Sequence, residues 1–106
     1  MALTLNAYQK YREIYSIYPK TDKDPLGGLY YAVLALCGES GELANKLKKA
    51  IRKHAEPDAL VLADELGDVL WYVAAVAQEL GLDLETIATM NLEKLEERRK
   101  ADKITG

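Results

Sequence analysis

The chain has 106 residues, of which 17 are acidic and 14 are basic, and its formal charge is −3. This length fits a single domain, and the acidic balance excludes a protein that binds nucleic-acid polymers through a basic face. A membrane span is excluded because no run of roughly 18 apolar residues is free of charges. Cys37 has no second cysteine to pair with, and the N-terminus lacks an apolar leader run, so we expect a cytoplasmic protein.

The first half of the chain predicts two helices. Apolar residues recur at three- and four-residue spacing almost throughout, so we expect an all-α, four-helix bundle-like domain. Thr4 can cap a first helix that carries four tyrosines on one side and ends at a loop over residues 19–25: Tyr8, Tyr11, Tyr15 and Tyr18. These tyrosines are expected to pack on the bundle or on a second subunit. A second helix is expected from Gly28 to His54, where a basic cluster suits a helix C-terminus.

The second half of the chain predicts two further helices. Pro57 fits the first turn of a third helix, which stops at Gly81. Asp83 can cap a fourth helix that fades near Ala101. Short connections favour antiparallel packing of neighbouring helices, and a chain of this size gains core from self-association.

Four carboxylates form two pairs at a spacing of three residues on the two central helices: Glu39 with Glu42, and Glu65 with Asp68. At about 100° per residue, each pair borders the apolar stripe of its helix on the same side. If the helices pack antiparallel through these stripes, the four acidic groups face one another at the edge of the core. The spacing therefore predicts one anionic pocket.

These carboxylates lack the cations that usually accompany charges on a solvated helix face. Glu42 has Lys46 four residues away, whereas Asp68 has Asp64 at that distance. Two like charges about 5 Å apart repel by roughly 3 kcal/mol at an effective dielectric constant of about 20. A divalent cation relieves this repulsion, and oxygen ligands suit Mg²⁺, with Mn²⁺ as a substitute. The alternative is an ordinary solvated acidic face.

Three glycines lie inside the predicted central helices and flank the acidic pairs: Gly38, Gly41 and Gly67. Each costs roughly 0.5 to 1 kcal/mol relative to alanine in a helix. Two interpretations stay open at this point. The glycines allow either close packing of the helices or the approach of a ligand.

The fourth helix gathers an amide and two cations within a sector of about 60°: Asn91, Lys94 and Arg98. The two cations can hold phosphate oxygens, and the amide can donate to or accept from a base or a sugar. A solvated helix face is the alternative for the two cations, because acidic residues lie near both of them.

Trp71 and Tyr72 follow Asp68 within four residues and can contact either the core or a nucleobase. For Trp71 we favour the core. Cys37 lies one position from the apolar stripe and has no histidine nearby in the sequence, so we expect a small buried packing residue. His54 lacks the Glu-x-x-His spacing of di-iron bundles, which argues against iron chemistry.

The acidic pairs and the fourth helix together resemble a known family. Glu-x-x-Glu, then 22 residues, then Glu-x-x-Asp, is similar to the MazG-like nucleoside triphosphate pyrophosphohydrolases, of the all-α superfamily that includes dimeric dUTPases. The resemblance covers nearly the whole chain, and its most specific stretches are residues 36–43, 64–71 and 91–98. Many members carry one more Glu directly before the first pair, where this chain has Gly38.

The resemblance implies hydrolysis of a nucleoside triphosphate between the α and β phosphates, to a monophosphate and pyrophosphate. It implies a homodimer or homotetramer, nucleotide contacts at Asn91, Lys94 and Arg98, and four Mg²⁺ ligands: Glu39, Glu42, Glu65 and Asp68. Glu39 or Glu42 can position the attacking water as a general base. Lys94 and Arg98 can offset charge on the leaving pyrophosphate.

Two other functions compete with this enzyme. In a helical binding or assembly module the acidic pairs form a solvated face, the tyrosines contact a partner, and Mg²⁺ leaves the stability unchanged. In a nucleotide sensor that has lost catalysis, Mg²⁺ and nucleotide stabilise the fold without forming product.

Overall fold

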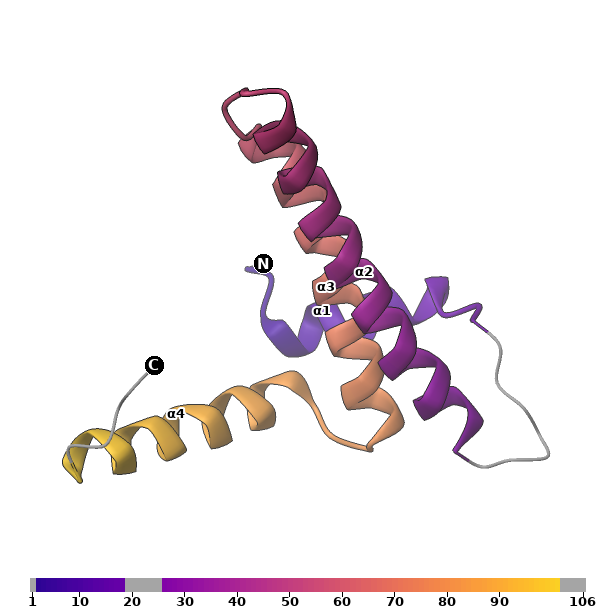
Figure 1. Ribbon diagram of the computed structural model, residues 1–106. Coiled ribbons are helices and arrows are strands. Elements are labelled where there is room, and N and C mark those ends of the chain that lie inside the picture. The colour runs from indigo at the N-terminus through magenta and orange to yellow at the C-terminus, as the bar shows by residue number, and fades with distance from the viewer. Residues whose placement is uncertain (1, 19–25, 102–106) are drawn as a thin grey trace.

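The computed structural model describes residues 2–18 and 26–101, and the regular elements within these ranges are all helical (Figure 1). The chain runs through α1 (Leu5–Tyr11), the 3₁₀ helix η1 (Arg12–Tyr15), α2 (Gly27–Arg52), α3 (Ala59–Glu79) and α4 (Leu84–Lys100). The predicted all-α class is confirmed. The loop expected over residues 19–25 lies outside the described residues. No helix in the described ranges is both long enough and apolar enough to cross a membrane.

Side-chain caps fix the starts of three helices. The Thr4 hydroxyl accepts a hydrogen bond from the Ala7 amide at the start of α1, and the Asp83 carboxylate accepts one from the Thr86 amide at the start of α4. Both caps confirm the prediction. Pro57 was placed wrongly, because Asp58 caps α3 and leaves Pro57 outside the helix. Asp58 is the stronger start signal because its side chain accepts from two amides that the helix leaves unpaired.

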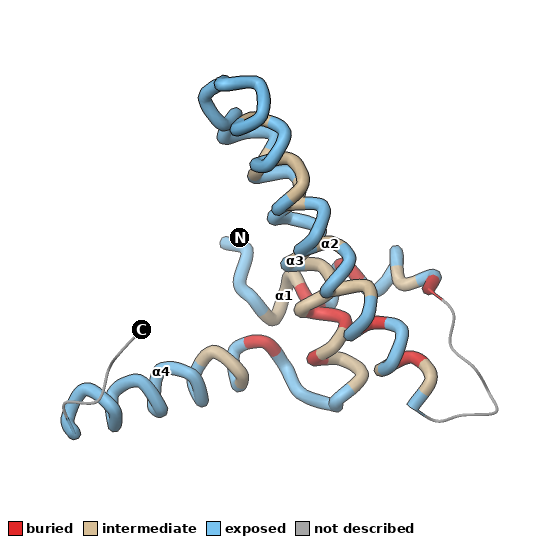
Figure 2. Tube along the Cα trace, in the orientation of Figure 1, coloured by how far each residue is buried: buried red, intermediate tan, exposed pale blue. Residues whose placement is uncertain are grey.

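The long helices α2 and α3 pack side by side as an antiparallel pair, joined by a short connection at one end (Figure 1). Ala32 of α2 and Ala75 of α3 are fully buried, and such small side chains let the two helices approach closely. Tyr18 completes this part of the core, and its hydroxyl donates to the Glu79 carboxylate at 2.6 Å. Figure 2 shows that the buried residues gather at the end of the pair that lies beside α1.

The N-terminal helix departs from the prediction of one regular helix with four tyrosines on a single side. It ends at Tyr11, and the chain continues as the 3₁₀ helix η1, in which three residues complete a turn. The change of pitch breaks the expected stripe. Tyr8 is half-buried and Tyr18 is buried, whereas Tyr11 and Tyr15 are exposed.

The start of α4 is held by α1. Gln9 receives a hydrogen bond from the Leu84 amide at 2.8 Å and donates one to the Leu82 carbonyl at 3.0 Å. Asn6 and Glu85 exchange two backbone-to-side-chain hydrogen bonds of 3.0 Å. Beyond this junction, residues 89–101 are exposed, and α4 projects away from the α2–α3 pair (Figure 1).

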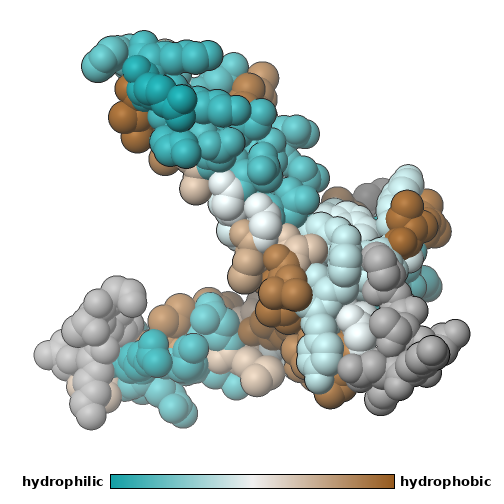
Figure 3. Space-filling model, turned by 45° about the vertical axis from the view of Figure 1, so that its right-hand side comes forward, coloured by the Kyte–Doolittle hydropathy of each residue, from teal (hydrophilic) through white to brown (hydrophobic). Residues whose placement is uncertain are grey.

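One chain leaves much of its apolar surface uncovered. The Cα radius of gyration is 16.7 Å, whereas a compact domain of about 100 residues has one of about 13 Å. Large apolar side chains are exposed on α2, α3 and α4, among them Leu34, Leu66 and Leu92. Figure 3 shows hydrophobic residues at the surface between the α2–α3 pair and α4.

Candidate metal and nucleotide site

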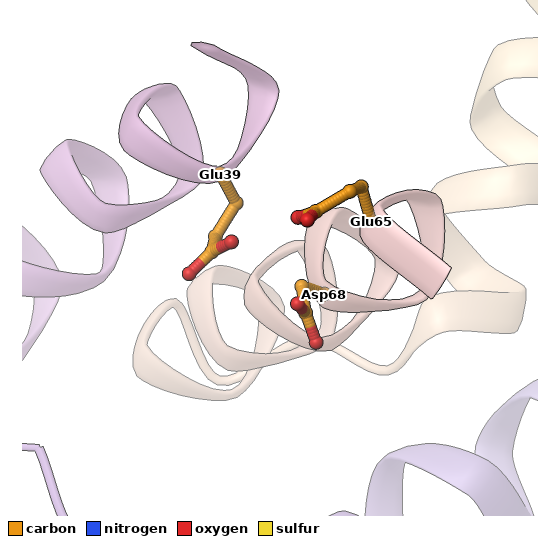
Figure 4. Close-up of side chains that lie close together, drawn as sticks. All are labelled: Glu39, Glu65 and Asp68. Atoms are coloured by element: carbon orange, nitrogen blue, oxygen red, sulfur yellow. The ribbon is translucent and has the colours of Figure 1, made fainter. Parts of the chain in front are cut away.

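Three carboxylates converge from the two long helices. Glu39 extends from α2, and Glu65 and Asp68 extend toward Glu39 from one face of α3 (Figure 4). One oxygen of each side chain lies within 4.8 Å of the others. Residues three apart share a helix face, which is why the Glu65–Asp68 spacing presents both groups to α2. Antiparallel packing therefore turns two local patterns into one cluster, which we call the carboxylate cluster.

The carboxylate cluster is short of positive charge. Burial raises the pKa of Glu39, and the negative charges of Asp68, Glu65 and Glu42 raise it further. Among the described residues, Lys46 offers partial compensation, since its Nζ lies 3.9 Å from Glu65 Oε1. That lysine is four residues from Glu42 in the sequence, yet it reaches across to α3 instead. Its side chain is 38% exposed, so solvent weakens the pair.

Glu42, the fourth carboxylate of the prediction, does not join the other three. It is exposed on α2, one turn beyond Glu39, and it acts on Glu39 through its charge. The structure thus brings together three of the four predicted groups, two of which are half-buried: Glu39 and Glu65.

An aromatic pocket of about 290 Å³ opens beside the carboxylate cluster. Its walls are two of the cluster's carboxylates and three aromatic rings: Glu39, Asp68, Tyr15, Trp71 and Tyr72. The ring centroids of Trp71 and Tyr72 lie 4.8 Å apart with an interplanar angle of 72°. Trp71 also packs against the buried core, so the same ring both contacts the core and forms a wall of the pocket.

The comparison with known proteins identifies the family. The family model described as "MazG nucleotide pyrophosphohydrolase domain" matches residues 31–101, which include the whole carboxylate cluster. The chain belongs to the MazG nucleotide pyrophosphohydrolase family. This confirms the resemblance and supports nucleotide pyrophosphohydrolase activity in general. The chain is also similar to Gene 37 protein of Mycobacterium phage L5, with 41% identity over 99 residues that cover 86% of this chain and 84% of that protein. No solved structure matches the chain.

Tyr15 is a wall of the MazG domain's pocket that the sequence analysis did not assign to the site. It lies on η1, before the residues that the family model matches. In the sequence it is one member of a tyrosine series, and nothing local sets it apart from Tyr11. Tyr15 reaches the pocket because the fold places η1 against α3.

The three polar residues predicted on α4 lie apart from the pocket of the same chain. Asn91, Lys94 and Arg98 are exposed, and none of them is a wall of the aromatic pocket. They belong to the projecting part of α4. Within one MazG chain, phosphate contacts from these residues are therefore not assembled with the carboxylate cluster.

The helical glycines of the MazG domain are surrounded by open space. At Gly38, Gly41 and Gly67, a Cβ atom would meet no atom within 4 Å beyond the local helix backbone, as judged from the described part of the chain. Close packing of helices within one chain therefore does not account for them. Cys37 of α2 was expected to be a small buried residue. It is exposed instead, because α3 covers the other side of α2.

The carboxylate cluster fits a divalent cation that prefers oxygen ligands. Its three groups are all carboxylates, they lie close together, and a half-exposed lysine is their nearby cation. Mg²⁺ and Mn²⁺ take such ligands, whereas structural zinc sites favour nitrogen and sulfur. The residues present thus match the divalent metal on which enzymes of this family generally depend.

Proposed function

We propose that this MazG domain hydrolyses a nucleoside triphosphate between its α and β phosphates and forms a nucleoside monophosphate and pyrophosphate. The observation that carries the proposal is the convergence of Glu39, Glu65 and Asp68 from two helices. The substrate is polyanionic, so an acidic cluster binds it only together with cations. The choice of the α–β bond rests on the family resemblance.

Glu39, Glu65 and Asp68 would hold Mg²⁺, with Glu42 as a further ligand and Mn²⁺ as a substitute ion. When bound, the ion supplies neutralisation of phosphate charge, orientation of the phosphates and a more acidic water. Glu42 is one turn from Glu39, so a change of its side-chain rotamer is the movement that would bring it closer.

Glu39 and Glu42 are the two candidates for the general base. Glu39 is half-buried beside the aromatic pocket, and its pKa is raised by burial and by its acidic neighbours. A general base must lie within hydrogen-bond reach of the water that it deprotonates. The position of Glu39 in the pocket wall supports it, while the exposed Glu42 stays the alternative.

The aromatic pocket would receive the nucleobase. Tyr15, Trp71 and Tyr72 present rings next to the carboxylates, and stacking of a base on an aromatic ring contributes about 1 to 3 kcal/mol. A substrate with its phosphates at the carboxylates would therefore place its base among these rings.

Asn91, Lys94 and Arg98 would contact the nucleotide bound to a second subunit. These residues project on α4 away from the pocket of their own chain. A homodimer or homotetramer can bring the projecting helix of one chain to the carboxylate cluster of another. The exposed apolar side chains described above support such an assembly.

A panel of ribonucleoside and deoxyribonucleoside triphosphates tests the proposal. We expect pyrophosphate and the corresponding monophosphate from at least one of them with Mg²⁺ present, and no product after chelation. Release of inorganic phosphate with a diphosphate product would place the cleavage at the other bond and contradict the proposal. Tight binding without any product would favour the nucleotide sensor, and the absence of both would favour the binding module.

A further inference from the structure

Arg12 is unusual because, in the described part of the chain, it is a buried cation that forms no ion pair with a carboxylate. Arg12 is only 3% exposed. Nη1 donates to Gln78 Oε1 at 2.8 Å, and Nη2 lies 3.5 Å from Ser16 Oγ. Nε is buried and has no hydrogen-bond partner, and within residues 2–18 and 26–101 no carboxylate forms an ion pair with the guanidinium.

The Arg12 guanidinium also contacts the ring of Trp71. Arg12 Cζ lies 4.3 Å from the ring centroid, over its face. Tyr72 meets the indole with a centroid distance of 4.8 Å, and Tyr18 meets it edge-on at 6.1 Å. A planar guanidinium stacks well on an aromatic face. The indole is therefore held by a cation and by two rings.

Trp71 connects this buried cation to the candidate site. The indole is a wall of the aromatic pocket together with Glu39 and Asp68, whereas Arg12 is not. Arg12 therefore contacts the ring without being a wall of this pocket, and it acts on a ligand there through Trp71. It belongs to η1, outside the residues 31–101 that the family model matches.

We propose that Arg12 is a positioning residue for the nucleotide, which fixes the indole of Trp71 as a rigid wall for the nucleobase. The inference rests on the proposed function. Burying a guanidinium without a carboxylate is unfavourable, so the contacts with Trp71 and Gln78 are those that offset the cost. The same contacts restrict the rotation of the indole. A wall ordered before the ligand arrives lowers the entropic cost of binding.

The test compares Arg12→Met with Lys10→Met, a cation-to-methionine change at an exposed position of α1, two residues before Arg12. We expect Arg12→Met to raise the KM for the nucleotide about tenfold, within the range of a stacking contribution, with kcat within about twofold of wild type. Arg12→Lys restores the charge without the planar stack and should recover KM in part. Lys10→Met should leave both constants unchanged.

Trp71 is the single tryptophan of the chain, so fluorescence excited at wavelengths that tyrosine does not absorb reports on this ring alone. A purely structural role for Arg12 lowers the melting temperature without changing how the indole meets a ligand. We expect a non-hydrolysable Mg²⁺–nucleotide to quench the wild-type emission at concentrations about tenfold lower than those needed for Arg12→Met. Binding of Mn²⁺ without nucleotide should be the same in both proteins.

A folded Arg12→Met protein with the wild-type KM and wild-type quenching overturns the inference. If Arg12→Met does not fold, Arg12→Lys keeps the charge and removes the planar stack. An unchanged KM and unchanged quenching in that variant then assign Arg12 a structural role. If the wild type neither hydrolyses nor binds any nucleotide, the proposed function fails as well. If the wild type is active and Arg12→Met matches it, this inference alone is wrong.

Discussion

Asp68 and Asp64 lie one turn apart on α3, and only Asp68 belongs to the carboxylate cluster. Asp68→Asn removes one of three close negative charges, so we expect it to raise the melting temperature of the metal-free protein slightly. The same change should remove the stabilisation by Mg²⁺. In the wild type, Mg²⁺ at about 100 times its dissociation constant should add roughly 2.7 kcal/mol, or several degrees.

Asp64→Asn is the matched control for this measurement. It removes an acidic group of the same type from the same helix, at an exposed position outside the cluster. Thermal melting with Mg²⁺ and with a chelator should show a wild-type response in the control. An equal Mg²⁺ response in Asp68→Asn would mean that the ion binds elsewhere.

Asp83 makes the stability of the fold depend on pH in the acid range. Its hydrogen bond from the Thr86 amide, 2.7 Å long, lowers the pKa of the carboxyl below the usual value. The stabilisation is therefore present above the ordinary aspartate pKa of about 3.9 and is lost as the pH falls through the lower folded value. We expect Asp83→Ala to lower the melting temperature by about 4 °C at neutral pH, and by less in acid.

Asp83→Ser separates the cap from its charge. Serine also accepts from the helix amide, but it does not titrate. At pH 7, the melting temperature of Asp83→Ser should be close to that of the wild type. As the pH falls to about 2, the contribution of the serine cap should stay constant, whereas that of the aspartate cap should be lost. A constant difference between wild type and Asp83→Ala over this range would contradict the assignment.

At the scale of elements, the glycines of α2 and α3 give the clearest test of what surrounds the pair. Gly41 lies inside α2 with open space around the position of a Cβ atom. Gly41→Ala should therefore stabilise the metal-free protein by about 0.5 to 1 kcal/mol in chemical denaturation. A loss of turnover in this more stable variant would favour the ligand-access interpretation.

Gly81 is the matched control, because it has a φ of +73°. There alanine is strained, and we expect Gly81→Ala to destabilise the protein by about 1 kcal/mol. Destabilisation by Gly41→Ala would instead reveal a neighbour of α2 that a single chain does not contain.

The helices themselves were largely predictable because their start and stop signals are local. Thr4 and Asp83 form caps with residues three positions away, and Gly81 supplies the left-handed residue after α3. The regular helix expected beyond Tyr11 was wrong. The buried side chain at the start of η1 is Arg12, stacked on Trp71 of α3, and this contact between distant segments is absent from any local pattern.

At the scale of the molecule, the candidate site was predictable to the extent that it depends on one helix pair. Spacing along α2 and α3 was sufficient to anticipate the meeting of Glu39 with Glu65 and Asp68. Tyr15 could not be anticipated, because its place depends on how η1 crosses α3. The direction of α4 depends on hydrogen bonds from α1 to its first turn, which no periodicity reveals.

The exposed apolar surface of one chain leads to a prediction about its assembly. Leu34 is 72% exposed on α2, near other exposed apolar side chains of the same helix, Tyr30 and Val33. Burial of apolar surface contributes about 25 cal/mol per Å², which gives this region a strong drive to be covered. We expect the protein to sediment as a dimer or tetramer at micromolar concentrations.

Leu34→Glu should shift this equilibrium toward the monomer, because association would bury an unpaired carboxylate. Lys53→Glu places the same side chain at the exposed connection between α2 and α3 and should leave the assembly intact. If α4 of one chain completes the site of another, Leu34→Glu should also lose most of its turnover while Mn²⁺ binding persists, since the carboxylate cluster lies within a single chain. A monomeric wild type with full activity would show that one chain suffices, and Asn91, Lys94 and Arg98 would then have no role in its site.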